Sequence, residues 1–419
     1  MVRNILWLFS LQGLNYLVPL AVLPYLVRVL GIERYGLIAF AQSFAQYFVV
    51  LTDYGFNLSA TKQITRIRSD RALVSNLFWC VIILKVLLMF LGIVILSLLI
   101  TIIPRFRAEP LLYAAAYLAV VGTVLFPIWL FQGMEQMKYI SIVSGSTKLA
   151  SAVALFLFVR HSYDYVLALG ILSGGMFAAG LLGFAVAIRT FAIAPQLPAI
   201  GDVINTLRDG WHLFVSTAAT SFYTNSNVFL VGVIAGNAQA GYFSAAEKIV
   251  RGIQAMLGPI TQAIYPHVNS LMGRSRDLAL AFLRKGFVWI GILSFIPSLL
   301  LFVFAGPVAH LVVGRMAEAC IPIFRCMAML PFIVAISNVL GIQTMIPFGL
   351  ERELSRIYVV AGLGSLGMSI VLIRHYGAVG AAASVLTVEF AIIVCMWAAL
   401  RHRGLHLLGL GALSAPTAS

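Results

Sequence analysis

Apolar segments of about 20 residues recur along the whole chain, with only short polar stretches between them. A helix needs about that length to cross a hydrocarbon layer of about 30 Å. One soluble core could not enclose so much apolar surface, since 61% of the 419 residues are hydrophobic and only 10% are charged. The sequence therefore predicts an all-α integral membrane protein.

The apolar segments form two sets of six, which gives about twelve predicted transmembrane helices. The first set covers 4–27, 36–56, 77–103, 111–131, 139–159 and 165–190, and the second covers 211–234, 241–269, 286–306, 320–342, 357–373 and 378–400. A polar stretch with two prolines separates the sets. We therefore expect one six-helix bundle at 1–190, a cytoplasmic connector at 191–210, a second bundle at 211–400 and a cytoplasmic tail at 401–419.

The net charge of +14 is distributed unevenly between alternate loops. One side of the membrane receives about seventeen Arg and Lys residues, with Lys62 and Lys148 among them, and the other about seven, with Arg28 among them. The positive-inside rule places the richer side in the cytoplasm, together with both termini. This explains the basic excess, so no nucleic acid is expected as a partner. The four cysteines lack metal-ligand spacing, and no cofactor is predicted.

The two halves repeat weakly at an offset near 205 residues. The stretch 26–36 resembles 230–242, and 68–70 resembles 274–277. Because each half has an even number of helices, the repeats would be parallel and related by a pseudo-twofold axis along the membrane normal.

Two predicted helices carry polar stripes at matching positions of this repeat. Gln42, Gln46, Asp53 and Asn57 share one face of the second helix, and Glu247, Arg251, Gln254 and Gln262 share one face of the eighth. Ionisable groups at membrane depth cost about 2.5–3.5 kcal/mol each on insertion scales, so they usually face a cavity or a partner. The stripes predict two walls of one water-filled cavity. The alternative is that they join helices by hydrogen bonds.

Other charges at membrane depth have more than one interpretation. Glu247 and Arg251 are spaced for an intrahelical ion pair, while Lys248 projects about 100° away from them. Lys85 can either snorkel to the cytoplasmic interface or face the site. Glu389 is a candidate for a proton- or cation-linked role, and also for a protonated contact between helices.

Several short motifs resemble a known family. They are Asp53-Tyr54-Gly55-Phe56-Asn57, the run from Gly241 to Lys248, Tyr265-Pro266 and the run from Gly377 to Ala382. In this order and spacing they resemble the polysaccharide transporters of the multidrug/oligosaccharidyl-lipid/polysaccharide exporter (MOP) superfamily, and among these the Wzx-type O-antigen flippases. The resemblance implies a MATE-like pair of six-helix bundles around a central cavity.

It also implies a cargo, which is an undecaprenyl-pyrophosphate-linked oligosaccharide carried to the periplasmic leaflet of the bacterial inner membrane. The implied cavity residues for the pyrophosphate and glycan are Arg28, Lys62, Lys248, Arg251, Gln42, Gln46 and Asn57, and the implied acidic or coupling residues are Asp53, Glu247 and Glu389. Membrane lipid, a glycan polymerase and a chain-length regulator are the further partners that it implies.

Two relatives within the superfamily stay open as alternatives, an ion-coupled drug or cation antiporter and a flippase for a lipid-linked peptidoglycan precursor. Among charges at membrane depth, bases only slightly outnumber acids, so the balance favours an anionic cargo weakly. A membrane enzyme is not expected, because the predicted outer loops are short and carry no paired carboxylates or histidine cluster. The chain also has no G-x-x-x-x-G-K loop for nucleotide, so transport would draw on a gradient or on the membrane potential.

Overall fold

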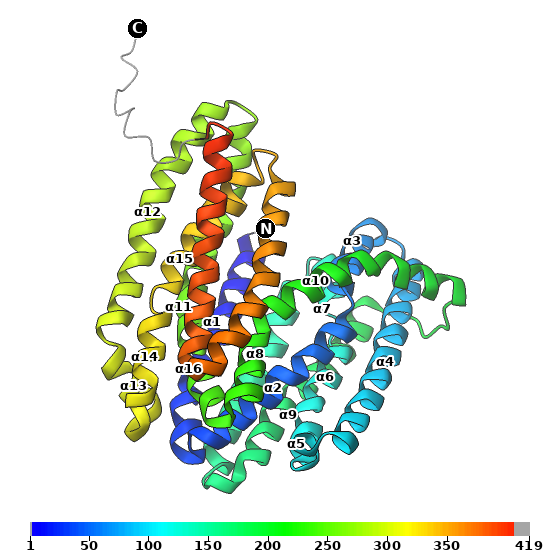
Figure 1. The fold of residues 1–419 in the computed structure, drawn as a ribbon. Helices are drawn as coiled ribbons and strands as arrows, with labels where there is room; N and C mark the ends of the chain where they lie inside the picture. The colour runs from blue at the N-terminus through cyan, green and yellow to red at the C-terminus, as the bar shows by residue number, and fades with distance from the viewer. Residues whose placement is uncertain (1, 406–419) are drawn as a thin grey trace. The chain divides into compact units, whose positions relative to one another are not determined.

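The computed structural model describes residues 2–405, and they are predominantly helical. Within this range, eight helices are long and apolar enough to span a membrane, and two shorter apolar segments are Tyr16–Leu30 and Thr224–Ala235. The chain divides into two compact units, Met1–Ser244 and Ala245–Ser419. The order of the helices along the chain can be followed in Figure 1.

The first unit contains ten α-helices, a short 3₁₀ helix and the first turns of an eleventh helix, as far as the described residues show. They are α1 (Val2–Leu30), α2 (Ile32–Asp53), α3 (Phe56–Ile67), α4 (Arg71–Ile102), α5 (Pro104–Arg107), α6 (Pro110–Leu125), α7 (Ile128–Gly133), α8 (Met137–Phe158), η1 (Ser162–Asp164), α9 (Tyr165–Phe191), α10 (Ile200–Ala235) and the start of α11 (Asn237–Met272). Proline opens α5 and α6, where the missing N–H costs nothing.

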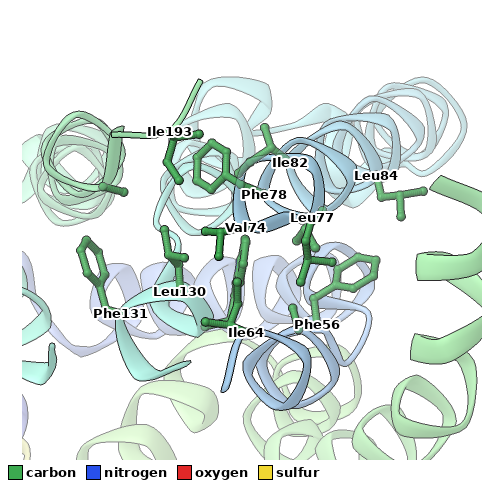
Figure 2. Close-up of a cluster of buried hydrophobic side chains, with 14 of the residues drawn as sticks. Phe56, Ile64, Val74, Leu77, Phe78, Ile82, Leu84, Leu130, Phe131 and Ile193 are labelled. Atoms are coloured by element: carbon green, nitrogen blue, oxygen red, sulfur yellow. The ribbon is translucent and has the colours of Figure 1, made fainter. Parts of the chain in front are cut away.

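The core at one end of this unit is formed by α3, α4 and α7. Figure 2 shows Ile64 of α3, Phe78 of α4 and Phe131 of α7 converging there, with Ile193 from the segment after α9. Trp129 is fully buried in the same cluster. The core therefore fixes α3 against the long helix α4 and the short helix α7, which positions the polar residues at the α2–α3 junction.

A sharp turn separates α2 from α3. Tyr54 (φ 43°) and Gly55 (φ 74°) both adopt left-handed backbone conformations, which end α2 at Asp53. The backbone of α10 packs so tightly on Gly55 that an added Cβ would lie 2.9 Å from the nitrogen of Phe214. The prediction that Asn57 continues the stripe of the second helix is therefore wrong, because Asn57 lies on α3, beyond this turn.

The second unit contains the rest of α11 and the helices that follow it. These are α12 (Arg276–Val303), α13 (Ala305–Val313), η2 (Gly314–Met316), α14 (Ala317–Met327), α15 (Leu330–Asn338), the π-helical turn η3 (Val339–Met345) and α16 (Glu351–His402). Gly377 interrupts α16 with a non-helical backbone (φ 56°, ψ −133°). The chain reverses there, because Ser369 and Ser384 hydrogen bond across the break with a distance of 2.8 Å between their Oγ atoms.

Both halves of α16 therefore count as spans, as the separate segments 357–373 and 378–400 predict. The charged and amide side chains of α11 lower its hydropathy and keep it out of the apolar set, although its 36 residues exceed the length of a span. With the shorter apolar segments of α1 and α10, with α11 and with both halves of α16 counted separately, the described residues hold about twelve spans, and the predicted all-α membrane fold is confirmed.

The structure repeats at the offset found in the sequence. Gly31 and Gly236 both have positive φ, and α2 and α11 begin at the residues that follow them. Asp70 and Ser275 are the matching N-caps of α4 and α12, and each side chain accepts a backbone hydrogen bond of the first turn. Corresponding helices of the two repeats thus start at corresponding residues.

Candidate functional site

A buried ion pair joins α2 to α4 in the first unit. The Nζ atom of Lys85 lies 2.8 Å from Oδ1 of Asp53 and donates a second hydrogen bond, of 3.1 Å, to the backbone carbonyl of Thr123. The Lys85 side chain is only 1% exposed, whereas that of Asp53 is 24% exposed. Of the two predictions for Lys85, snorkelling to the interface is wrong, because the ammonium is enclosed between helices.

The local backbone explains why this pair forms. Asp53 is the last residue of α2, where the helix dipole disfavours a carboxylate, and the Lys85 ammonium offsets both that dipole and the carboxylate charge. No other charged side chain among the described residues is as fully buried as Lys85.

Asn57 completes a small polar cluster around Asp53. Its Nδ2 donates to Oδ2 of Asp53 over 3.2 Å across the Tyr54–Gly55 turn. Its enclosed Oδ1 accepts no hydrogen bond within the described part of the chain. The hydroxyl of Thr61 donates to the carbonyls of both Asn57 and Trp129, which ties α3 to α7. Asp53 and Asn57, predicted as neighbours on one helix, are thus brought together by a turn.

The remaining candidates of the first unit do not converge on this cluster. Gln42 is half-buried and Gln46 exposed on α2, three and two turns before Asp53. Arg28 is exposed in the last turn of α1, where a cation also suits the helix dipole. Lys62 is exposed on α3.

Arg28 and Lys62 lie near opposite ends of α8. Tyr25, one turn before Arg28, bonds the carbonyl of Val159 just after α8, whereas α3 packs against α7 just before it. Since the 22 residues of α8 span about 33 Å, these two cations cannot bind the same diphosphate group.

Lys148 is a candidate that the sequence reasoning missed. The charge count assigned it to a cytoplasmic loop, and this is wrong, because Lys148 lies in the middle of α8 and is half-buried. Ser141 and Ser151, two turns before and one turn after it on the same side of the helix, are buried. The position of Lys148 inside the expected span 139–159 was the signal that could have found it.

In the second unit, Glu247 and Arg251 of α11 form the predicted intrahelical pair. The Nη2 and Nε atoms of Arg251 lie 2.7 Å and 3.1 Å from Oε1 of Glu247. The Arg251 side chain is 44% exposed and that of Glu247 is 16% exposed, so the arginine is partly accessible while the glutamate is mostly covered. Lys248 is half-buried on the adjacent face. The prediction of an i, i+4 pair is confirmed.

Glu389 is half-buried on the second half of α16 and lies near Tyr358 of the first half, close enough to interact electrostatically. Glu389 lies on a different helix from the polar residues of α11 and far from them in the sequence. Gln262, the last member of the predicted stripe on α11, falls among the side chains that the structure does not describe.

Comparison with known proteins assigns the family. A family model described as polysaccharide biosynthesis protein matches residues 1–272. Two curated relatives, from Escherichia coli (strain K12) and Shigella dysenteriae, are each 32% identical over 403 residues, which is 96% of this chain and 97% and 100% of theirs. Both carry the name "Putative O-antigen transporter".

The chain belongs to the polysaccharide biosynthesis protein family. This polysaccharide transporter is a multi-pass membrane protein, and the resemblance read from its sequence motifs is confirmed. Its fold matches an inward-facing MATE-family multidrug resistance transporter of the MOP superfamily, with a TM-score of 0.69, 14% identity and coverage of 93% of this chain and 95% of that one. It also matches the lipid II flippase MurJ in an inward closed conformation, with a TM-score of 0.66, 10% identity and coverage of 96% and 88%. At these identities the likeness concerns the fold alone.

Proposed function

We propose that this protein is a flippase that moves an undecaprenyl-pyrophosphate-linked oligosaccharide, the repeat unit of an O-antigen or related surface glycan, from the cytoplasmic to the periplasmic leaflet. The observation that carries the proposal is the 32% identity, over almost the full length of both chains, to proteins named as O-antigen transporters. The protein would then reside in the bacterial inner membrane with both termini in the cytoplasm. A glycan polymerase and a chain-length regulator would act on the delivered units.

The physical problem is the passage of a diphosphate and a sugar chain through hydrocarbon. Neither group crosses about 30 Å of hydrocarbon unaided, because each loses its hydration there. A cavity with fixed cations replaces part of that hydration, and a guanidinium matches the geometry of phosphate oxygens. Arg251 suits this role because Glu247 holds its guanidinium in place and its side chain is partly exposed. Lys248 and Lys148 are further candidate cations at membrane depth.

In this proposal the acidic and amide residues serve the glycan and the coupling. The partly exposed carboxylate of Asp53, with Asn57 beside it, offers acceptors for sugar hydroxyls or for a coupling cation. Gln42 and Gln46 would extend that polar surface along α2, and the exposed Arg28 and Lys62 would meet the cargo near the two ends of its path. Alternate opening to each side of the membrane would complete transport.

Complementation tests this proposal in cells. A bacterium that lacks its own O-antigen flippase is transformed with the gene, and its lipopolysaccharide is separated by size. We expect the ladder of O-antigen chains to return. If the gene restores no ladder but raises tolerance to cationic dyes, the protein is a drug antiporter. If it rescues cells depleted of their lipid II flippase, its cargo is the peptidoglycan precursor.

A further inference from the structure

The N-terminal part of α10 has an apolar stripe that the protein itself leaves uncovered. Val203, Leu207 and Phe214 face the core of the first unit. The adjoining stripe contains Ile200 and Trp211, which are 79% and 50% exposed, and also the exposed Ile204 and Val215. Asn205, Asp209 and His212 lie on the remaining face. Around the helix, the buried stripe, the exposed apolar stripe and the polar face follow one another in order.

This part of α10 is held in place by contacts with α3 and α4. Before the helix, Ala194 bonds to Ser75 and Trp79 of α4. Within it, Asp202 accepts a hydrogen bond of 2.8 Å from Asn76, and Asp209 accepts one of 3.1 Å from Gln63. In Figure 1 this part of α10 runs across the end of α4 rather than alongside it. The apolar stripe is therefore presented outward by a fixed scaffold.

The length of α10 decides what can cover the stripe. Its 36 residues extend about 54 Å, whereas a span needs about 30 Å. The apolar segment Thr224–Ala235 lies at the far end of α10. The first turns of α10 therefore lie outside the hydrocarbon core. They are at the end of the unit that the charge pattern predicts to be cytoplasmic.

We propose that residues 197–215 form an interfacial anchor that lies in the headgroup layer of the cytoplasmic leaflet. Leu197, Ile200 and Ile204 would enter the acyl boundary, and Trp211 would sit at headgroup level, as amphipathic aromatic rings do. The exposed Arg208 borders the apolar stripe and would meet lipid phosphates. This assignment does not depend on which cargo the protein moves.

Spin labels on neighbouring residues test the anchor in the full-length protein. Cys326 and Cys395 are replaced by alanine, the buried Cys80 and Cys320 are kept, and a nitroxide is attached to Ile204→Cys or, as the matched control, to Asn205→Cys. Each variant is reconstituted in vesicles of phosphatidylethanolamine and phosphatidylglycerol. The collision rates of the nitroxide with oxygen, which partitions into lipid, and with a water-soluble nickel chelate are then measured.

We expect the label at Ile204 to collide more with oxygen than with the nickel chelate, and the label at Asn205 to show the reverse order. If both labels collide mainly with the nickel chelate, the segment lies in water and the proposal fails. If the label at Ile204 is shielded from both reagents, a protein surface covers the stripe, which also overturns the lipid assignment.

Discussion

Gly36 and Gly241 occupy matching positions of the repeat and pack reciprocally, each against the first residue of the other's helix. A Cβ added to Gly36 of α2 would overlap the backbone oxygen of Asn237, with which α11 begins. A Cβ added to Gly241 would overlap the backbone oxygen of Ile32, with which α2 begins. Arg105 reinforces this contact, since its Nη2 donates a 2.7 Å hydrogen bond to Oδ1 of Asn237. The second helices of the two repeats therefore begin with a backbone contact that only glycine allows.

Gly36→Ala and Gly241→Ala should each destabilise the protein, by about 1–3 kcal/mol if the helices must separate to admit the methyl group. Gly174→Ala in α9 is the matched control, because a Cβ there meets nothing within 4 Å. The thermal unfolding midpoint of the detergent-solubilised protein should fall for the first two variants and stay unchanged or rise for the third. Equal midpoints for all three would show that the contact is loose.

Each residue of the Asp53–Lys85 pair should be needed only while its partner is present, because the lone charge is costly and the loss of both is not. Asp53→Asn leaves the buried Lys85 ammonium without its counter-charge, which typically costs about 3–5 kcal/mol. Asp53→Asn combined with Lys85→Met removes both charges and should recover much of the lost thermal stability. Glu353→Gln is the control, because the Glu353–Arg403 pair is much more exposed to solvent than Asp53–Lys85 and should contribute little to stability. A double variant no more stable than Asp53→Asn would contradict this account.

Arg251→Ala should impair transport while the protein still inserts normally. The loss of a charge-assisted contact with phosphate is worth about 1.5–3 kcal/mol, which is roughly a ten- to hundredfold loss of rate. Arg325→Ala is the comparison, since Arg325 is an exposed cation of α14 outside the proposed site. Surface-glycan output in cells with only the variant, normalised to its membrane level, is the measurement. Normal output from Arg251→Ala would mean that the polar stripe of α11 serves helix packing.

Lys148→Met should also reduce transport, because it removes a cation from the middle of α8 without creating a cavity. Lys138→Met is the matched control at the start of the same helix, where the ammonium lies 4.8 Å from the centre of the Tyr139 ring. The same cellular assay reports both variants. If Lys148→Met transports normally and Lys138→Met does not, the cargo contacts the end of α8 and not its middle.

Much of the fold could be predicted because hydrophobicity along the chain directly reports burial in lipid. The spans, the break before Gly377 and the Glu247–Arg251 pair all depend on local sequence, and all three are found. Hydrophobicity along the chain does not reveal where α10 begins. The helix starts at Ile200, inside the predicted connector 191–210, because an interfacial helix is too polar to register as a span.

The residues whose positions were predicted wrongly are held by contacts between segments that are far apart in the sequence. The turn at Tyr54 and Gly55 is stabilised by the packing of α10, which no local pattern reveals. The burial of Lys85 depends on Asp53, which lies 32 residues away on another helix. Lys148 was misplaced because the charge count treated every cation of a polar-studded segment as a loop residue, although this one lies at mid-span.

Reconstitution tests the central claim most directly. The purified protein is placed in liposomes with a fluorescent undecaprenyl-pyrophosphate oligosaccharide, and a membrane-impermeant glycosidase is added outside. The account predicts that the fraction of glycan cleaved rises from about half, the share already in the outer leaflet, towards completion in liposomes with the protein. A cleaved fraction identical to that of protein-free liposomes, from correctly folded protein and under an imposed gradient, would contradict it.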